Sequence, residues 1–368
     1  MPGTLHTLKR RNVTRGERSR HRRALVVVLV GVGALAVTLA VHGRHSRAPD
    51  NRMRSAEPTT SGSKPTSSKT STKIIPVTVV GSYAVGTMSL DVAGPSGSPT
   101  RVLPTTVWYP ANGGRKGLVP GVAHGPFPLL VFSQGYNISV SSYAGLLTDW
   151  ASAGFVVAAP TYPHTDPSDP AALDENDIVN HPADLRAVIT AVLGNAEGPG
   201  SVLSGLIKAS EIGLVGHSDG GDVSLAVADN SCCRDVRVKA VAILSGAELV
   251  TFGGRYFGRV SVPLLAVQGS ADPINVPACS VQFYDAANPP KYYLDLLRAS
   301  HEPPYTEAGT TDQRIVARVT TDFFDAELAG QTAGTGAIMI GGDVAGTAQI
   351  TAGVSAPPSS GTCPGAPG

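Results

Sequence analysis

The sequence predicts an α/β fold, in which a mostly parallel central sheet carries helices on both faces. From about residue 74, short apolar runs typical of buried strands alternate with helical stretches. This alternation favours parallel strands joined by right-handed helical crossovers. The chain of 368 residues is 42% hydrophobic, which is enough to bury a sizeable core.

The expected elements follow one another in a regular order. Two early strands, forming an antiparallel edge, are expected at 77–80 and 101–109. Later strands are expected at 128–132, 155–159, 211–215, 238–244, 262–267 and 291–297. Helices are expected at 141–154, 182–193, 218–228 and 312–328. The tail is expected to add a strand at 337–340 or to be loose.

The amino-terminal part of the chain divides into a basic leader and a long apolar run. Residues 1–23 contain eight Lys and Arg but a single acidic residue, Glu17. Residues 24–41 carry no charge and as a helix would span about 27 Å, close to a bilayer core. The pattern predicts an uncleaved membrane anchor with its basic end in the cytoplasm. A cleaved signal peptide and a buried core helix are the alternatives.

The remaining domain boundaries follow from composition. Residues 42–73 are rich in Ser, Thr, Pro, Arg and Lys, which is typical of a flexible linker. One α/β domain is expected at 74–330, outside the cytoplasm, followed by a Gly/Ala/Thr-rich tail at 331–368. The formal net charge of +1 gives no electrostatic basis for binding nucleic acid.

The four cysteines are Cys232, Cys233, Cys279 and Cys363. Export would permit disulfides, and four cysteines can pair in three ways. The adjacent Cys232 and Cys233 also fit two small, partly buried thiols, so the pairing stays open. Closely spaced pairs of metal ligands are absent from the sequence, and no metal is expected.

The segment 216–220, Gly-His-Ser-Asp-Gly, follows a predicted buried strand and precedes a predicted helix. A serine in a sharp strand-to-helix turn needs glycine two positions before and after it, because a side chain there would collide. The same five-residue pattern also occurs by chance in Gly-rich turns, but the flanking elements favour function. Ser218 is therefore the predicted nucleophile.

A serine nucleophile needs a base and an orienting acid. Asp272 follows the strand at 262–267 and His301 follows the strand at 291–297, so both are expected at the carboxyl edge of the sheet. The order Ser, acid, His also fits this kind of turn. If they have no catalytic role, Asp272 belongs to an ordinary Asp-Pro turn and His301 is a solvated histidine in a loop. The earlier histidines, expected to be structural or pocket-lining, are His124, His164, His181 and His217.

An oxyanion hole requires backbone donors close to the nucleophile. The expected donors are the N–H of Asp219, directly after Ser218, and the N–H of Tyr136, after the strand at 128–132. Tyr136 and Tyr162 are expected to contact the substrate. The segment 162–180 is expected to form part of the pocket rim or a lid.

Five short segments resemble one branch of the α/β hydrolases, over about residues 77–328. They are 106–110 (TVWYP), 135–137 (GYN), 216–221 (GHSDGG), 269–273 (GSADP) and 300–301 (SH). This branch includes platelet-activating-factor acetylhydrolase-like, chlorophyllase-like and polyester-hydrolase (cutinase-like) enzymes. The resemblance implies the α/β-hydrolase fold and hydrolysis of carboxylic esters without metal or organic cofactor. It also implies that Tyr136 flanks the acyl pocket.

Asp219 departs from this branch, in which the residue after the nucleophile is commonly apolar or amide-bearing. A carboxylate turned inward would oppose the charge of the oxyanion in a site of low dielectric constant. We therefore expect the Asp219 carboxylate to point away or to be hydrogen-bonded. Asp219→Asn should then raise the hydrolysis rate by no more than about tenfold.

Together these features predict a serine-dependent carboxylic ester hydrolase that is membrane-anchored or secreted. Its expected partners are a small-molecule or lipid ester and, through residues 24–41, the membrane. The alternatives are an acyltransferase with the same three catalytic residues and an inactive hydrolase-fold binding protein. The sequence contains no feature that favours a peptidase.

Overall fold

The computed structural model describes residues 81, 83–95, 100–112, 119–120, 125–330, 334–359 and 361–364. The predicted leader, apolar run and linker, as well as the strand expected at 77–80, lie outside these residues. Within the described ranges, no helix is both long and apolar enough to cross a membrane. The described residues all belong to one structural unit, Thr72–Gly368.

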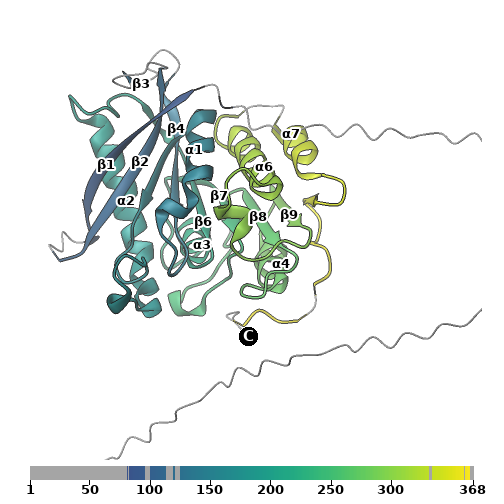
Figure 1. The fold of residues 1–368 in the computed structure, drawn as a ribbon. Helices are drawn as coiled ribbons and strands as arrows, with labels where there is room; N and C mark the ends of the chain where they lie inside the picture. Colours follow the sequence, from purple (N-terminus) through teal and green to yellow (C-terminus); the bar gives the residue numbers. More distant parts are fainter. Residues whose placement is uncertain are drawn as a thin grey trace, which may run out of the picture. The chain divides into compact units, whose positions relative to one another are not determined.

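A ten-stranded sheet forms the centre of this unit (Figure 1). Its strands are β1 (Ala84–Ala93), β2 (Val102–Asn112), β3 (Val119–Pro120), β4 (Phe127–Ser133), β5 (Val156–Pro160), β6 (Ile207–His217), β7 (Val238–Leu244), β8 (Leu264–Gly269), β9 (Lys291–Leu296) and β10 (Ala348–Ala352). Their spatial order is β1-β2-β5-β4-β6-β7-β8-β9-β10, with β3 paired to β2. The central strands β5, β4, β6, β7, β8 and β9 are parallel, whereas both edges pair antiparallel.

Helices follow most of the parallel strands. The α-helices are α1 (Ala144–Ala153), α2 (His181–Glu197), α3 (Asp219–Asp229), α4 (Pro277–Ala286), α5 (Pro303–Thr306), α6 (Thr311–Glu327) and α7 (Gly334–Gly342). The 3-10 helices are η2 (Val140–Tyr143), η3 (Pro170–Ala172), η4 (Glu175–Asn180) and η5 (Val250–Phe252). The predicted α/β class is therefore confirmed, whereas strand β1 and helices α4 and α7 were not expected from the sequence.

Two hydrophobic layers separate the sheet from its helices. Every residue of β4 is buried, as expected for a parallel strand covered on both faces. Leu129 of β4 belongs to the layer shared with Leu185 of α2, whereas its neighbour Leu130 belongs to the layer shared with Trp150 of α1 and Phe324 of α6. The alternation of side chains along each strand thus supplies both cores.

The prediction of a strand at 337–340 is wrong, because these residues lie within helix α7. Ile338 is buried, whereas Ile340 is 73% exposed. Residues two apart share one face of a strand but lie on different faces of a helix, so this burial pattern fits a helix. The additional strand of the tail is β10, which pairs antiparallel with β9.

Two disulfides resolve the pairing that the sequence leaves open. Cys232 is joined to Cys233, and Cys279 of α4 is joined to Cys363 near the end of the chain. The second bond holds the tail in a small buried cluster with Ala247. It therefore places the tail beside the carboxyl end of β7.

Candidate active site

Ser218 lies in a sharp turn between strand β6 and helix α3. Its φ of 54° and ψ of −128° lie in a region that a residue with a side chain rarely adopts, so the turn is strained. A Cβ on Gly216 would collide with the carbonyl of Gly220. A Cβ on Gly220 would collide with the carbonyl of Ser133. The two glycines thus permit the turn that exposes the serine hydroxyl.

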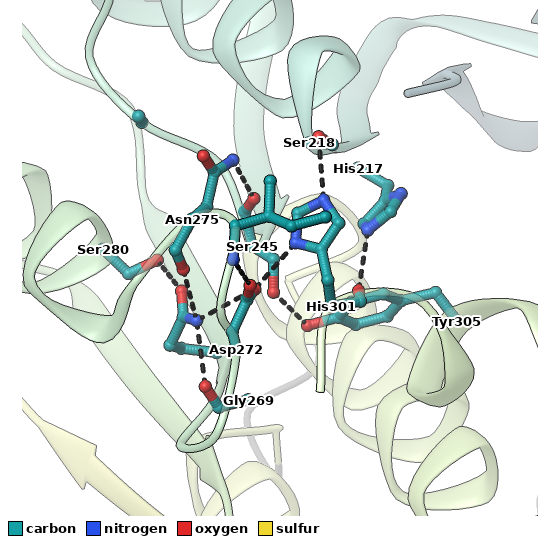
Figure 2. Close-up of polar contacts among 12 residues, drawn as sticks. His217, Ser218, Ser245, Gly269, Asp272, Asn275, Ser280, His301 and Tyr305 are labelled. Atoms are coloured by element: carbon teal, nitrogen blue, oxygen red, sulfur yellow. Dashed lines mark hydrogen bonds and ion pairs between the residues drawn. The ribbon is translucent and has the colours of Figure 1, made fainter. Parts of the chain in front are cut away.

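The structure brings Ser218, His301 and Asp272 together at the carboxyl edge of the sheet. His301 Nε2 lies 2.9 Å from Ser218 Oγ, and His301 Nδ1 lies 2.7 Å from Asp272 Oδ2 (Figure 2). All three residues are buried. The arrangement has the geometry in which a histidine removes a proton from a serine and a carboxylate holds the histidine.

A small network fixes the orientation of the Asp272 carboxylate. Its Oδ1 accepts a hydrogen bond from the Ile274 N–H at 2.9 Å, and its Oδ2 lies 3.3 Å from Gln268 Nε2. The amide of Gln268 is itself oriented, because Ser280 Oγ donates to its Oε1 at 2.6 Å (Figure 2). Sequence reasoning overlooked Gln268, although a polar residue near the end of an apolar strand and shortly before an acid was an available signal.

His217 links His301 to the loop at Gly135 through a chain of hydrogen bonds. Its Nε2 donates to the His301 carbonyl at 2.9 Å, so its Nδ1 accepts the Tyr143 O–H at 2.7 Å. The Tyr143 oxygen in turn accepts the Gly135 N–H at 3.3 Å. Burial, and then the nearby His301, lowers the pKa of His217 to about 3, so His217 is neutral. This position fits the expectation that His217 is structural or pocket-lining, whereas no feature of the sequence pointed to Tyr143.

The predicted oxyanion loop lies against the nucleophile. A Cβ placed on Gly135 would lie 3.1 Å from Ser218 Cβ. Tyr136 follows directly, and the Asn137 N–H anchors the loop to the Thr165 carbonyl at 2.8 Å. On the other side of Ser218, Asp219 is the first residue of α3, where N–H groups are free of intrahelical partners.

The carboxyl of Asp219 is buried beside the nucleophile. Its Oδ2 has no hydrogen-bond partner among the described residues, so the expectation that the carboxylate points away or is hydrogen-bonded stays a prediction. Burial, followed by the charge of Glu175, raises the pKa of Asp219 to about 7, although His301 and its own N–H act in the opposite direction. Near neutral pH a large share of this carboxyl is therefore uncharged, which weakens its repulsion of an oxyanion.

A cavity of about 180 Å³ adjoins the turn at Ser218. Asp219, Glu175 and Ile178 contribute to its walls, together with Leu249 and Asn275. Glu175 and Ile178 belong to η4, so part of the predicted rim segment 162–180 does border a cavity beside the nucleophile.

The other predicted residues differ in their burial and in whether they lie next to Ser218. Tyr136 is half-buried, next to the nucleophile. Tyr162 is fully buried, with its hydroxyl 2.9 Å from Ser133 Oγ and its ring stacked on His181. These buried contacts do not support the expected contact of Tyr162 with the substrate. His164 is exposed, and His124 lies outside the described residues.

Within the part of the chain that the structure describes, no group of three or more His, Cys, Asp and Glu side chains is arranged to hold a metal ion. The described sheet and the strained serine turn between a strand and a helix are those of the α/β-hydrolase fold, and the family match given next supports an ester hydrolase of this type. Residues 117–249 match the family model described as Chlorophyllase. That match contains the loop at Gly135 and the turn at Ser218, and it supports the resemblance to the chlorophyllase-like branch. The curated proteins contain no match to this chain.

Proposed function

We propose that the protein is a serine-dependent carboxylic ester hydrolase that acts through an acyl-enzyme. The observation that carries this proposal is the continuous hydrogen-bonded set of Ser218, His301 and Asp272, at 2.9 and 2.7 Å. The match to the Chlorophyllase family model supports ester hydrolysis as the reaction class.

In the first half of the reaction, Asp272 accepts the Nδ1–H of His301 and so keeps the lone pair on Nε2, facing Ser218. Nε2 takes the hydroxyl proton while Oγ forms a bond to the ester carbonyl carbon. The N–H groups of Tyr136 and Asp219 stabilise the resulting oxyanion. When the carbon–oxygen bond to the alcohol breaks, His301 returns the proton to the departing alkoxide.

In the second half, His301 takes a proton from water, and the hydroxide oxygen bonds to the acyl carbon. The bond to Ser218 Oγ then breaks, and the proton on His301 restores the serine hydroxyl. The products are one carboxylic acid and one alcohol, without any oxidant or reductant. All proton transfers in this cycle pass through Nε2 of one histidine.

A panel of p-nitrophenyl esters of increasing acyl length tests this function. The wild-type protein should hydrolyse at least the short esters, and Ser218→Ala and His301→Gln should each lower kcat by a factor of about 10⁴ or more. Hydrolysis that persists undiminished in Ser218→Ala would contradict the proposal. Added alcohol that diverts most of the acyl group into a new ester would instead favour an acyltransferase.

We further propose that the catalytic domain lies outside the cytoplasm, held by a membrane anchor at 24–41. The basic leader before this apolar run supports that orientation. The disulfide between Cys279 and Cys363 also supports an oxidising compartment. The proposal predicts that protease added to intact cells removes the domain and that washing with salt does not release it. A domain protected from protease in intact cells would contradict it.

A further inference from the structure

A second cavity, of about 470 Å³, lies in the loop that follows strand β7. Its walls are mainly apolar and include Leu249, Val250, Tyr256 and Phe257. Leu249 also lines the smaller cavity that contains Asp219, the neighbour of Ser218. The two cavities therefore meet at Leu249, and the larger one adjoins the cavity beside the turn at Ser218.

Glu248 places an acidic group among the mostly apolar side chains of this cavity. Its side chain lines the cavity although the residue is only 7% exposed. Among the described residues, no hydrogen bond or ion pair engages its carboxyl, and Arg255, the cation that also lines the cavity, is exposed. Because the oxygens of this carboxyl are not fully enclosed by the described residues, a molecule in the cavity can reach them. A ligand that donates a hydrogen bond would satisfy Glu248.

The wall of the cavity is held in place by the turn that contains the Cys232–Cys233 disulfide. Asn230 Nδ2 donates to the Gly253 carbonyl at 2.9 Å, and the Ser231 N–H donates to the Arg255 carbonyl at 2.9 Å. Gly254 has a φ of +70°, and a Cβ there would collide with Asn230 Oδ1. These contacts give the cavity a defined shape before any ligand binds, which is typical of small-molecule sites.

We propose that this cavity binds the distal arm of the ester substrate, an apolar arm that ends in a hydrogen-bond donor accepted by Glu248. The donor is a hydroxyl or an ammonium group. The inference rests on the proposed hydrolase function and adds the substrate class. The apolar walls favour the body of the arm, and the buried carboxyl selects the donor at its end, because a site built to hydrogen-bond a substrate group rejects analogues that lack it.

Two series of synthetic esters test this proposal. One series has a common p-nitrophenol leaving group and straight acyl arms of several lengths that end in methyl, hydroxyl or ammonium. The other has a common acetyl group and alcohol arms with the same three ends, which shows whether the arm belongs to the acid or to the alcohol. In one of the two series, and at one arm length, the wild-type kcat/KM should be about tenfold or more higher for an ester that ends in a donor than for the ester that ends in methyl.

Variants of Glu248 distinguish the effect of its carboxyl group on substrate preference from the effect of the cavity's shape. Glu248→Leu should abolish the preference for both donor ends. Glu248→Gln keeps an acceptor oxygen but no charge, so it should retain the preference for hydroxyl and lose that for ammonium. Glu327→Gln is a matched control on helix α6, where the carboxyl interacts with Tyr292 instead, and it should leave all preferences unchanged.

Equal wild-type activity on methyl and donor ends in both series would overturn the proposal, as would an unchanged preference in Glu248→Leu. If Glu248→Leu fails to fold, the wild-type panel and Glu248→Gln still decide. A wild-type protein that hydrolyses no ester and does not react with a phosphonate probe would refute the proposed function itself. Hydrolysis without any preference would refute only the role of Glu248.

Discussion

The hydroxyl of Tyr143 lies 2.7 Å from Nδ1 of His217, and this contact joins the oxyanion loop to the predicted catalytic base. On one side, Tyr143 receives the Gly135 N–H, and on the other, His217 donates to the His301 carbonyl. We expect both side chains to act as positioning residues, because they hold the backbone at Gly135 relative to His301.

Tyr143→Phe should lower kcat for ester hydrolysis by about tenfold and leave KM within about twofold, because the oxyanion loop matters mainly in the transition state. Steady-state kinetics on one nitrophenyl ester measure both constants. Tyr284→Phe is the matched control, since it also removes a buried hydroxyl, one that bonds to the Val354 carbonyl. Equal losses of kcat in the two variants would contradict a specific role for Tyr143.

The serine turn predicts a large effect of a single methyl group. Gly220→Ala should destabilise the fold by about 2–4 kcal/mol, because its Cβ would collide with the backbone carbonyl of Ser133, which cannot rotate away. Gly194→Ala in helix α2 meets no atom within 4 Å and should stabilise by about 0.5–1 kcal/mol. Urea unfolding of both variants measures the difference. A neutral Gly220→Ala would show that the turn is not as tight as described.

Replacing the Asp219 carboxyl with an amide should raise the activity in a pH-dependent way. Its pKa is raised to about 7, so it is mostly neutral below pH 7 and becomes charged beside the oxyanion hole above pH 7. Asp219→Asn should change kcat/KM less than about twofold at pH 6 and raise it about three- to tenfold at pH 9. The ratio of variant to wild type across this pH range measures the effect. A ratio that does not vary with pH would contradict titration of Asp219 next to the reaction.

Arg101 connects the sheet edge to the rim of the small cavity. Its guanidinium binds the fully buried Asp184 of α2 at 2.5 Å and Asp177 of η4 at 2.8 Å. Arg101→Met should cost about 3–5 kcal/mol, because it leaves the Asp184 carboxylate buried and unpaired. Adding Asp184→Asn should recover part of that loss in urea unfolding. If the second substitution gave no recovery, the unpaired charge would not be the cause.

The sequence predicted much of the sheet and the three central residues of the site for one physical reason. Ser218, Asp272 and His301 each follow an apolar strand, and parallel strands bring their carboxyl ends to one edge. Tyr143 could not be found this way, because its contact with His217 depends on how η2, directly before helix α1, packs against the sheet. The partner of Cys363 likewise depends on the path of the tail. Asp219 was recognised as unusual, but its pKa is raised first by burial and then by the charge of Glu175 in η4, and both depend on the folded chain.

The strand predicted at 337–340 shows a different kind of error. A short apolar run is compatible with a strand or a helix, and its length alone does not decide between them. The burial of Ile338 beside an exposed Ile340 decides for a helix, and that information exists only in the folded chain.

The central claim is that Ser218 is an activated nucleophile. The most direct test is to treat the folded protein with a fluorophosphonate probe and to locate the adduct by mass spectrometry. We expect one adduct, on Ser218, that is absent in Ser218→Ala and forms much more slowly in His301→Gln, because the serine then lacks its base. A folded protein that remains unlabelled, or that carries its adduct elsewhere, would show that Ser218 is not an activated nucleophile.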